Sequence, residues 1–128
     1  MNMSFILVDD DEINNFINER KIRSEHPEAA LSIFTNPAKG LEHILNNFTK
    51  ESSDKTIIFL DLNMPEMSGW EFANQIAKAE LSENENLLIY ITSSSLNASD
   101  IDRARNSDHI VDFIEKPLSK EFLETLKA

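Results

Sequence analysis

Short apolar segments alternate along the chain with longer segments whose apolar residues recur at every third or fourth position. Continuous apolar runs of four to eight residues are typical of buried strands, and the longer period is typical of helices packed on one side. The expected strands are residues 4–8, 31–34, 56–60, 87–91 and 110–114. The expected helices are residues 11–25, 37–48, 70–79 and 99–107, with a last helix after Ser119. This alternation predicts an α/β fold with a parallel sheet.

The apolar positions of each helical segment predict which side of the helix faces the sheet. The first helix should turn Ile13, Phe16 and Ile17 inward. The other helices should bury the following residues: Leu41, Ile44, Leu45 and Phe48; Ala73, Ile76 and Ala77; Ile101 and Ala104; Phe122, Leu123 and Leu126. The predicted caps at helix starts are Asn36, Ser119 and a capping box formed by Ser99 and Asp102. With two apolar positions, helix 99–107 should be marginal.

Right-handed crossovers between successive parallel strands restrict the sheet to a few strand orders. The expected order is 2-1-3-4-5, which makes the chain a doubly wound five-stranded sheet, a flavodoxin-like three-layer sandwich. Strands 1 and 3 then lie side by side where the order reverses. Ligands of such folds bind at the carboxyl ends of the strands next to this point. The residues that follow strands 1 and 3 are therefore the first candidates for a site.

Four of the expected strands end in polar residues that could share one site. Asp9 and Asp10 follow the first strand, Asp61 the third, Thr92 the fourth and Lys116 the fifth. Carboxylates packed together repel one another unless a cation lies between them, and hard divalent cations take oxygen ligands. Mg²⁺ with a phosphate group is the best match, and the lysine ammonium could contact a phosphoryl oxygen. Together these groups suit in-line phosphoryl transfer.

Each of these residues also has a purely structural interpretation. The acids of residues 9–11 could begin a helix, where carboxylates are favourable and one of them serves as N-cap. Asp61 could merely end a strand before a turn, Lys116 could be a surface lysine, and Thr92 could be a capping hydroxyl. A site is favoured because all of them fall at the same ends of four strands.

Composition narrows the function classes. At 128 residues we expect a single domain, residues 1–128. The net charge of −11 argues against direct binding to nucleic acid, and the absence of cysteine excludes disulfides and thiolate ligands. Two glycines and an acidic first loop argue against FMN or NAD. The apolar runs are too short to span a membrane and nothing resembles a signal peptide, so we expect a cytoplasmic protein.

Four motifs occur along the chain in a fixed order. They are Val8 to Glu12, Leu60 to Gly69, Ile91 to Ser93, and Glu115 to Pro117. Together they resemble the receiver domain of bacterial two-component response regulators, and the resemblance covers nearly the whole chain. It implies a signalling module that takes a phosphoryl group from a sensor histidine kinase or a histidine phosphotransfer protein.

The resemblance also implies roles for single residues. Asp61 would be the phosphoacceptor and would carry an aspartyl phosphate. Asp9 and Asp10 would be the acid pair for Mg²⁺, with Asp10 expected as the direct ligand. Asp61 and the backbone carbonyl of Asn63 would complete the metal ligands. These assignments make Mg²⁺ the expected cofactor.

A conformational switch is implied as well. Thr92 would hydrogen-bond the phosphoryl group, Lys116 would contact it, and the peptide bond before Pro117 would be cis. Movement of Thr92 toward the phosphoryl group would leave room for Phe113 to turn inward, which biases an equilibrium of the face formed by helix 4, strand 5 and helix 5. Phe113 could equally be a core aromatic that never moves.

No effector segment follows the last helix, so we expect a stand-alone receiver that signals to a downstream protein. It should not be a turnover enzyme, beyond its own phosphorylation and dephosphorylation. A phosphohydrolase of the haloacid dehalogenase type is the alternative, because Asp9 and Asp11 have that family's spacing of two acids. That family needs a Thr or Gly soon after and usually a longer chain. A receiver-like scaffold that is never phosphorylated is less consistent with the complete set of acids and lysine.

Overall fold

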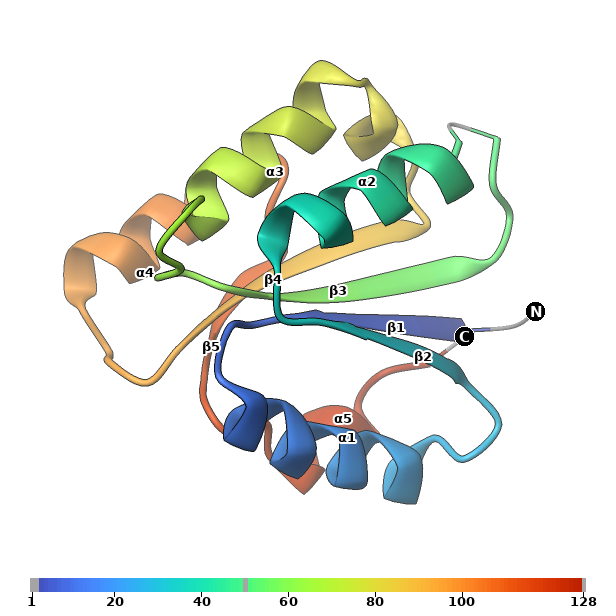
Figure 1. Cartoon of the computed structure of the whole chain (residues 1–128), viewed down its shortest axis with the longest axis vertical. Coiled ribbons are helices and arrows are strands. Elements are labelled where there is room, and N and C mark those ends of the chain that lie inside the picture. Colours follow the sequence, from blue (N-terminus) through green and yellow to red (C-terminus); the bar gives the residue numbers. More distant parts are fainter. Residues whose placement is uncertain (1–2, 50, 128) are drawn as a thin grey trace.

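A parallel sheet lies between two layers of helices in the computed structural model, which describes residues 3–49 and 51–127 (Figure 1). The strands are β1 (Met3–Val8), β2 (Ala30–Phe34), β3 (Lys55–Asp61), β4 (Leu87–Ser93) and β5 (Asp112–Glu115). The helices are α1 (Glu12–Glu25), α2 (Pro37–Asn47), α3 (Gly69–Lys78), the 3-10 turn η1 (Leu81–Glu83), α4 (Ala98–Arg105) and α5 (Lys120–Glu124). All the expected strands and helices are present, with shifted ends.

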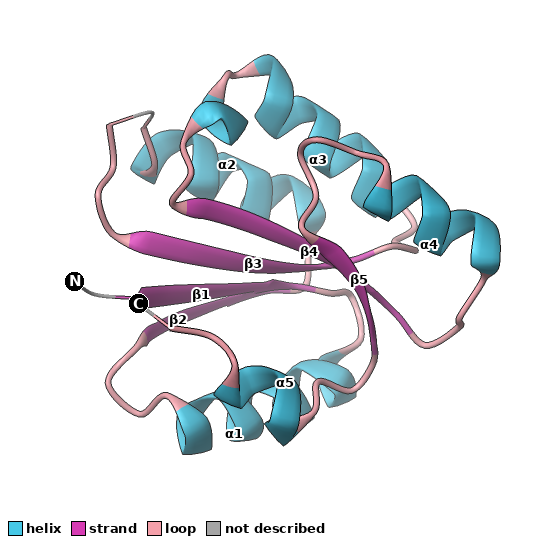
Figure 2. Ribbon diagram, turned by 180° about the vertical axis from the view of Figure 1, so that it is seen from behind, coloured by secondary structure: helices cyan, strands magenta, loops and turns pink. Residues whose placement is uncertain are grey.

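The order of the strands is β2-β1-β3-β4-β5, and all the pairings are parallel. Helices α2, α3 and α4 cover one face of the sheet, and α1 and α5 cover the other (Figures 1 and 2). The doubly wound, flavodoxin-like prediction is therefore confirmed. Val8 at the end of β1 pairs with Leu60 of β3. Asp9 and Asp61 follow them, and so meet at the edge of the sheet where the strands end, here called the carboxyl edge.

The central strands β1, β3 and β4 are buried on both faces, as their continuous apolar runs predict. One apolar cluster packs residues such as Ile58 and Ile91 against α2 and α3. A second packs Phe5 and Phe59 against the residues of α1 and α5. The carboxyl edge of the sheet is thus held by packed apolar layers on both sides.

Several helices begin directly after a residue whose side chain accepts hydrogen bonds from the first turn. Asn36 and Ser119 accept hydrogen bonds from the first turns of α2 and α5, which confirms both predictions. The predicted capping box of Ser99 and Asp102 is wrong. Asn97 is the N-cap of α4 instead, and its Oδ1 accepts from the backbone N–H of Ser99 at 2.9 Å. Asparagine competes well for this position because its short side chain reaches the free N–H groups.

The predicted inner face of α1 is wrong. Ile13 and Phe16 are 74% and 59% exposed, and Ile17 is also exposed. The buried residues of α1 are Asn15, Asn18 and Ile22. Apolar periodicity predicts the buried side of a helix only when the residues on that side are apolar. In α1 two amides occupy it and bond to backbone groups near the carboxyl edge.

Smaller corrections concern other helices and β5. Leu45 of α2 is exposed, and Ala77 of α3 is only half-buried. Phe72, which the pattern did not single out, is fully buried beneath α3. Strand β5 begins at Asp112, and Ile110 is buried in the turn before it. None of the described helices is both long and apolar enough to cross a membrane.

Candidate functional site

Three carboxylates meet at the carboxyl edge. Asp9 directly follows β1, and Asp61 is the last residue of β3. One carboxylate oxygen from each of Asp9, Asp10 and Asp61 lies within 4.8 Å of the other two. Asp9 and Asp61 are buried, whereas Asp10 is exposed at the mouth of the cluster. The strand register brings Asp9 and Asp61 together, since they are 52 positions apart along the chain.

Lys116 lies against two of these acids. Its Nζ donates to Asp9 Oδ2 at 3.0 Å and to Asp61 Oδ1 at 3.2 Å, and its side chain is largely buried. One ammonium therefore serves two carboxylates. With Asp10 beside them and all three carboxylates ionised, the cluster has a formal charge of −2, which is suited to a divalent cation with oxygen ligands.

Asp9 is held by more than the lysine. Its Oδ1 accepts from the backbone N–H of Asp11 at 2.9 Å, and its Oδ2 accepts from Asn14 Nδ2 at 2.7 Å as well as from Lys116. Both oxygens are thus already engaged. The exposed Asp10 is the member of the pair with the freer approach to a cation.

The electrostatics of the cluster centre on Asp61. Burial and the negative charge of Asp9 raise the pKa of Asp61 to about 7, against the opposing effect of Lys116. Burial alone would lower the pKa of Lys116, but its hydrogen bond to Asp9 and the two negative charges raise it above the usual range. Asp61 is therefore partly protonated near neutral pH, and added positive charge would favour its ionised form.

Thr92 and Asn63 flank Asp61. Thr92 is buried on β4 and pairs with Asp61 in the register of the sheet. Its backbone carbonyl accepts from the N–H of Leu62 at 2.9 Å. Asn63 is exposed, and its backbone N–H lies 3.4 Å from Asp61 Oδ1. Both residues are placed beside the carboxylate that the resemblance names as phosphoacceptor.

The remaining predicted residues lie on or after β5. The peptide bond between Lys116 and Pro117 is cis. Phe113 is buried and packs within the apolar cluster under α2, α3 and α4. Its side chain thus already has the inward position that the expected switch assigns to the phosphorylated state.

Asp11 is engaged in capping. Its Oδ1 accepts from the backbone N–H groups of Ile13 and Asn14 at 3.0 and 3.2 Å, which makes it the N-cap of α1. A carboxylate used in this way is poorly suited to serve as the second catalytic acid of a phosphohydrolase. The predicted alternative with Asp9 and Asp11 therefore finds no support in the site.

The start of α3 is pressed against Asp61. The N–H of Gly69 donates to Leu62 O at 2.9 Å, and a Cβ at this position would lie 2.8 Å from Asp61 O. The motif contains this glycine, but only the fold shows the close approach that requires it. Asn14 and Asn15 carry no apolar signal, and their bonds to Asp9 were missed for that reason.

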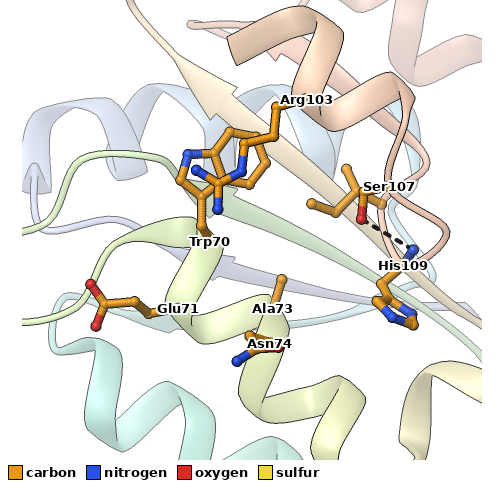
Figure 3. Close-up of a pocket in the computed structure, with 8 residues that line it drawn as sticks. Trp70, Glu71, Ala73, Asn74, Arg103, Ser107 and His109 are labelled. Carbon is orange, nitrogen blue, oxygen red and sulfur yellow. Dashed lines mark hydrogen bonds between the residues drawn. The ribbon is translucent and has the colours of Figure 1, made fainter. Parts of the chain in front are cut away.

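A separate pocket of about 400 Å³ lies between α3 and the segment from α4 to β5 (Figure 3). Arg103 of α4 stacks over the ring of Trp70 at 4.4 Å, and Asn74 and His109 line the same hollow. Asp9, Asp10, Asp61 and Lys116 are not among the residues that line it. The chemistry of the carboxyl edge is therefore not shared with this pocket.

Comparisons with known proteins identify a family and similar structures. A family model described as the response regulator receiver domain matches residues 5–127. Among solved structures, a two-component response regulator from Cytophaga hutchinsonii is 28% identical, with 97% of this chain and 92% of that chain covered and a TM-score of 0.85. A response regulator receiver protein from Dyadobacter fermentans is 26% identical, with coverages of 96% and 93% and a TM-score of 0.82.

A more distant fold match comes from a co-crystal structure of two yeast proteins. It contains the Saccharomyces cerevisiae histidine phosphotransfer protein Ypd1 and the receiver domain of its downstream response regulator Ssk1. The match has 22% identity, covers 95% of this chain and 83% of that chain, and has a TM-score of 0.73. No curated protein matches the chain.

Proposed function

Because the chain belongs to the response regulator receiver domain family of two-component signalling, we propose that Asp61 is its phosphoacceptor. One observation carries the proposal. The carboxylate of Asp61 is buried at the end of β3, within 4.8 Å of the oxygens of Asp9 and Asp10 and 3.2 Å from Lys116 Nζ. A carboxylate in this position can attack phosphorus while neighbouring groups stabilise the charge of the phosphoryl oxygens.

The proposed reaction is a single phosphoryl transfer. An oxygen of Asp61 forms an O–P bond, the N–P bond of the donor's phosphohistidine breaks, and the released imidazole nitrogen takes up a proton. Lys116 is already 3.2 Å from Asp61 and contacts the new phosphoryl oxygens. Thr92 pairs with Asp61 in the register of the sheet, and its hydroxyl donates a hydrogen bond to the same group.

Mg²⁺ is the proposed cofactor, and the donor set is suited to it. Asp10, Asp61 and the carbonyl of Asn63 would ligate the ion, with Asp9 completing the acid pair. The ion would supply positive charge that keeps Asp61 ionised at neutral pH and neutralises phosphoryl oxygens. Three carboxylate oxygens lie within 4.8 Å of one another, and Lys116 bonds to two of these acids, which supports this assignment.

The proposed output is a shift of the face formed by α4, β5 and α5. Phosphorylation adds about −1.5 to −2 charges at Asp61, which attracts the hydroxyl of Thr92. Phe113 is buried in this structure, so the proposal requires an outward side chain to be populated before phosphorylation. The fluorine signal of a 4-fluorophenylalanine at position 113 would show two environments if this is so.

The proposed donor is a histidine kinase or a histidine phosphotransfer protein. Helix α1 begins next to the acid pair and exposes Ile13, Phe16 and Ile17. A donor must bring its histidine to Asp61, so an apolar surface beside the carboxyl edge is well placed to bind it. The yeast receiver domain that shares this fold was crystallised with a histidine phosphotransfer protein, which supports this class of partner.

The test is incubation with acetyl phosphate and Mg²⁺, read by intact mass. We expect one added phosphoryl group, which is lost in Asp61→Asn and in the presence of EDTA. The matched control is Asp54→Asn, because Asp54 is an exposed acid just before β3. Labelling of Asp61→Asn at the wild-type level would overturn the proposal.

Three further predictions concern the size of the native protein, its location and its catalytic activity. Function as a stand-alone receiver predicts a native protein of the mass of this chain. A cytoplasmic location predicts its recovery in the soluble cytosolic fraction. The absence of other catalysis predicts no steady hydrolysis of p-nitrophenyl phosphate.

A further inference from the structure

The inner face of α1 is built from amides. Asn15 and Asn18 are 4% and 3% exposed, and Ile22 is the buried apolar residue of the helix. Burial of an amide is unfavourable unless it is hydrogen-bonded. The two asparagines therefore need partners on the elements that α1 covers, and those partners lie in loops of the carboxyl edge.

Asn18 and Lys21 hold both backbone polar groups of Leu118. The N–H of Leu118 donates to Asn18 Oδ1 at 3.0 Å in a buried contact, and Lys21 Nζ donates to Leu118 O at 2.8 Å. The side chain of Leu118 is fully buried. Helix α5, which follows this segment, has only five residues. Two hydrogen bonds from α1, which lies beside α5, thus anchor the segment after β5 (Figure 2).

Lys116 is two residues before this anchor. Its backbone N–H donates to Ser93 O at 2.9 Å, which continues the pairing of β5 with β4. Its Nζ divides its hydrogen bonds between Asp9 Oδ2 at 3.0 Å and Asp61 Oδ1 at 3.2 Å. A small shift of the segment would change this division. The contact between lysine and Asp61 therefore depends on where Leu118 is held.

We infer that Asn18 is a positioning residue that sets the contact between Lys116 and Asp61, with Lys21 in a lesser supporting role. The inference deepens the proposed function, because it identifies which part of the fold aligns the phosphoryl-contacting lysine. Asn18 acts through Leu118, without touching the acids itself. Loss of its oxygen leaves the buried N–H of Leu118 without an acceptor, and the segment relaxes toward another one.

The main test observes the lysine directly in metal-free protein. In ¹⁵N-labelled protein, a buried, ion-paired ammonium exchanges protons slowly enough to be detected by NMR. The signal of Lys116 is assigned by its loss in Lys116→Met. We expect Asn18→Ala to remove or strongly shift this signal, and Asn18→Asp, which keeps an acceptor oxygen, to restore it. The matched control is Asn86→Ala, since Asn86 binds Ser52 O at the opposite end of β4.

Folded Asn18→Ala protein with an unchanged Lys116 signal would overturn the inference. If Asn18→Ala does not fold, Lys21→Met keeps the test decisive, because it removes the bond to Leu118 O and leaves the buried amide intact. We expect a smaller shift of the same signal in that variant, and an unchanged signal would count against the inference.

A thermal double-mutant cycle separates positioning from simple loss of stability. The drop in Tm caused by Asn18→Ala should be smaller by about 4 °C or more in the Lys116→Ala background, because the contact to be aligned is gone. Equal drops in both backgrounds would mean a purely structural asparagine. These readouts use no phosphoryl donor. Failure of acetyl phosphate labelling would therefore overturn the proposed function. The role of Asn18 would still be decided by the Lys116 signal and the thermal cycle.

Discussion

Helices α1 and α3 approach the same carboxylates from opposite faces of the sheet, yet different forces hold them in place. The inner side of α3 consists of Phe72, Ala73 and Ile76, all buried in one apolar cluster. The inner side of α1 contains the amides of Asn15 and Asn18 beside Ile22, and Ile13, Phe16 and Ile17 point outward. Helix α3 is held by apolar burial, and α1 largely by hydrogen bonds to the loops of the site.

The two helices position different parts of the site. Helix α3 packs directly against the backbone at Asp61, because Gly69 has no side chain to keep the start of the helix away from β3. Asn15 of α1 donates to Asp9 O, and Asn18 accepts from the N–H of Leu118. An amphipathic helix stabilises its domain by burying apolar side chains. A helix with amides on its inner side buries less apolar surface, but its hydrogen bonds fix the positions of the loops that it contacts.

Removal of the largest side chain under α3 should have the largest effect. Phe72 is fully buried, so we expect Phe72→Ala to lower the free energy of unfolding by about 3–5 kcal/mol. Urea denaturation followed by far-UV circular dichroism measures this change. A loss below about 1 kcal/mol would mean that apolar burial is not what holds α3.

The carboxylate between the two helices should lower stability at high pH. The pKa of Asp61 is about 7 in the folded protein and 3.8 in the unfolded chain, so the folded state binds the proton more tightly. Stability is therefore lost as pH rises from about 4 to 7 without metal. At pH 8 in EDTA we expect Asp61→Asn to be more stable by roughly 2–4 kcal/mol.

Two controls sharpen this prediction. At pH 4 the stabilising effect of Asp61→Asn should nearly vanish, because the wild-type carboxyl is then protonated in the folded protein. Added Mg²⁺ at pH 8 should stabilise the wild type more than the variant. Thermal denaturation at both pH values gives the comparison, and equal effects at pH 4 and pH 8 would refute the raised pKa.

The helix start under Asp61 should tolerate no side chain. In Gly69→Ala the new Cβ would lie 2.8 Å from Asp61 O and 3.1 Å from Leu62 Cα, both backbone atoms. We expect a loss of about 1–3 kcal/mol and slower labelling by acetyl phosphate. Gly40→Ala is the matched control, because its Cβ would meet side chains of Val8 and Phe34 at 3.2 and 3.3 Å. A smaller loss there is expected, since side chains can move.

The smallest effect on stability should come from the outer side of α1. Phe16 is 59% exposed, so Phe16→Ala should change the free energy of unfolding by less than about 0.5 kcal/mol. Labelling by acetyl phosphate should be unchanged, because the small donor does not need a docking surface. Transfer from a phosphorylated histidine protein should slow several-fold. Unchanged transfer from its cognate donor would show that this side of α1 is not the docking surface.

Most of the fold could be predicted because its signals are local. The runs that became β1, β3 and β4 are apolar on both faces, and caps such as Asn36 and Ser119 stand where the helices begin. Four strands that end in polar residues predicted a site at the carboxyl edge. The misassigned face of α1 and the misplaced cap of α4 share one cause. In both, a side-chain amide took a place that apolar or capping-box patterns assign to other residues.

The sequence by itself determined the strand order, the meeting of Asp9, Asp10 and Asp61, and the chemistry that such a meeting permits. These follow from periodicity, crossover handedness and residue type, which are properties of short segments and their order. Only the tertiary structure decided that Lys116 divides its bonds between two acids, that Gly69 lies against Asp61, and that α1 turns its asparagines inward. Such contacts join residues far apart in the chain. Their distances depend on how whole elements pack, which no local pattern records.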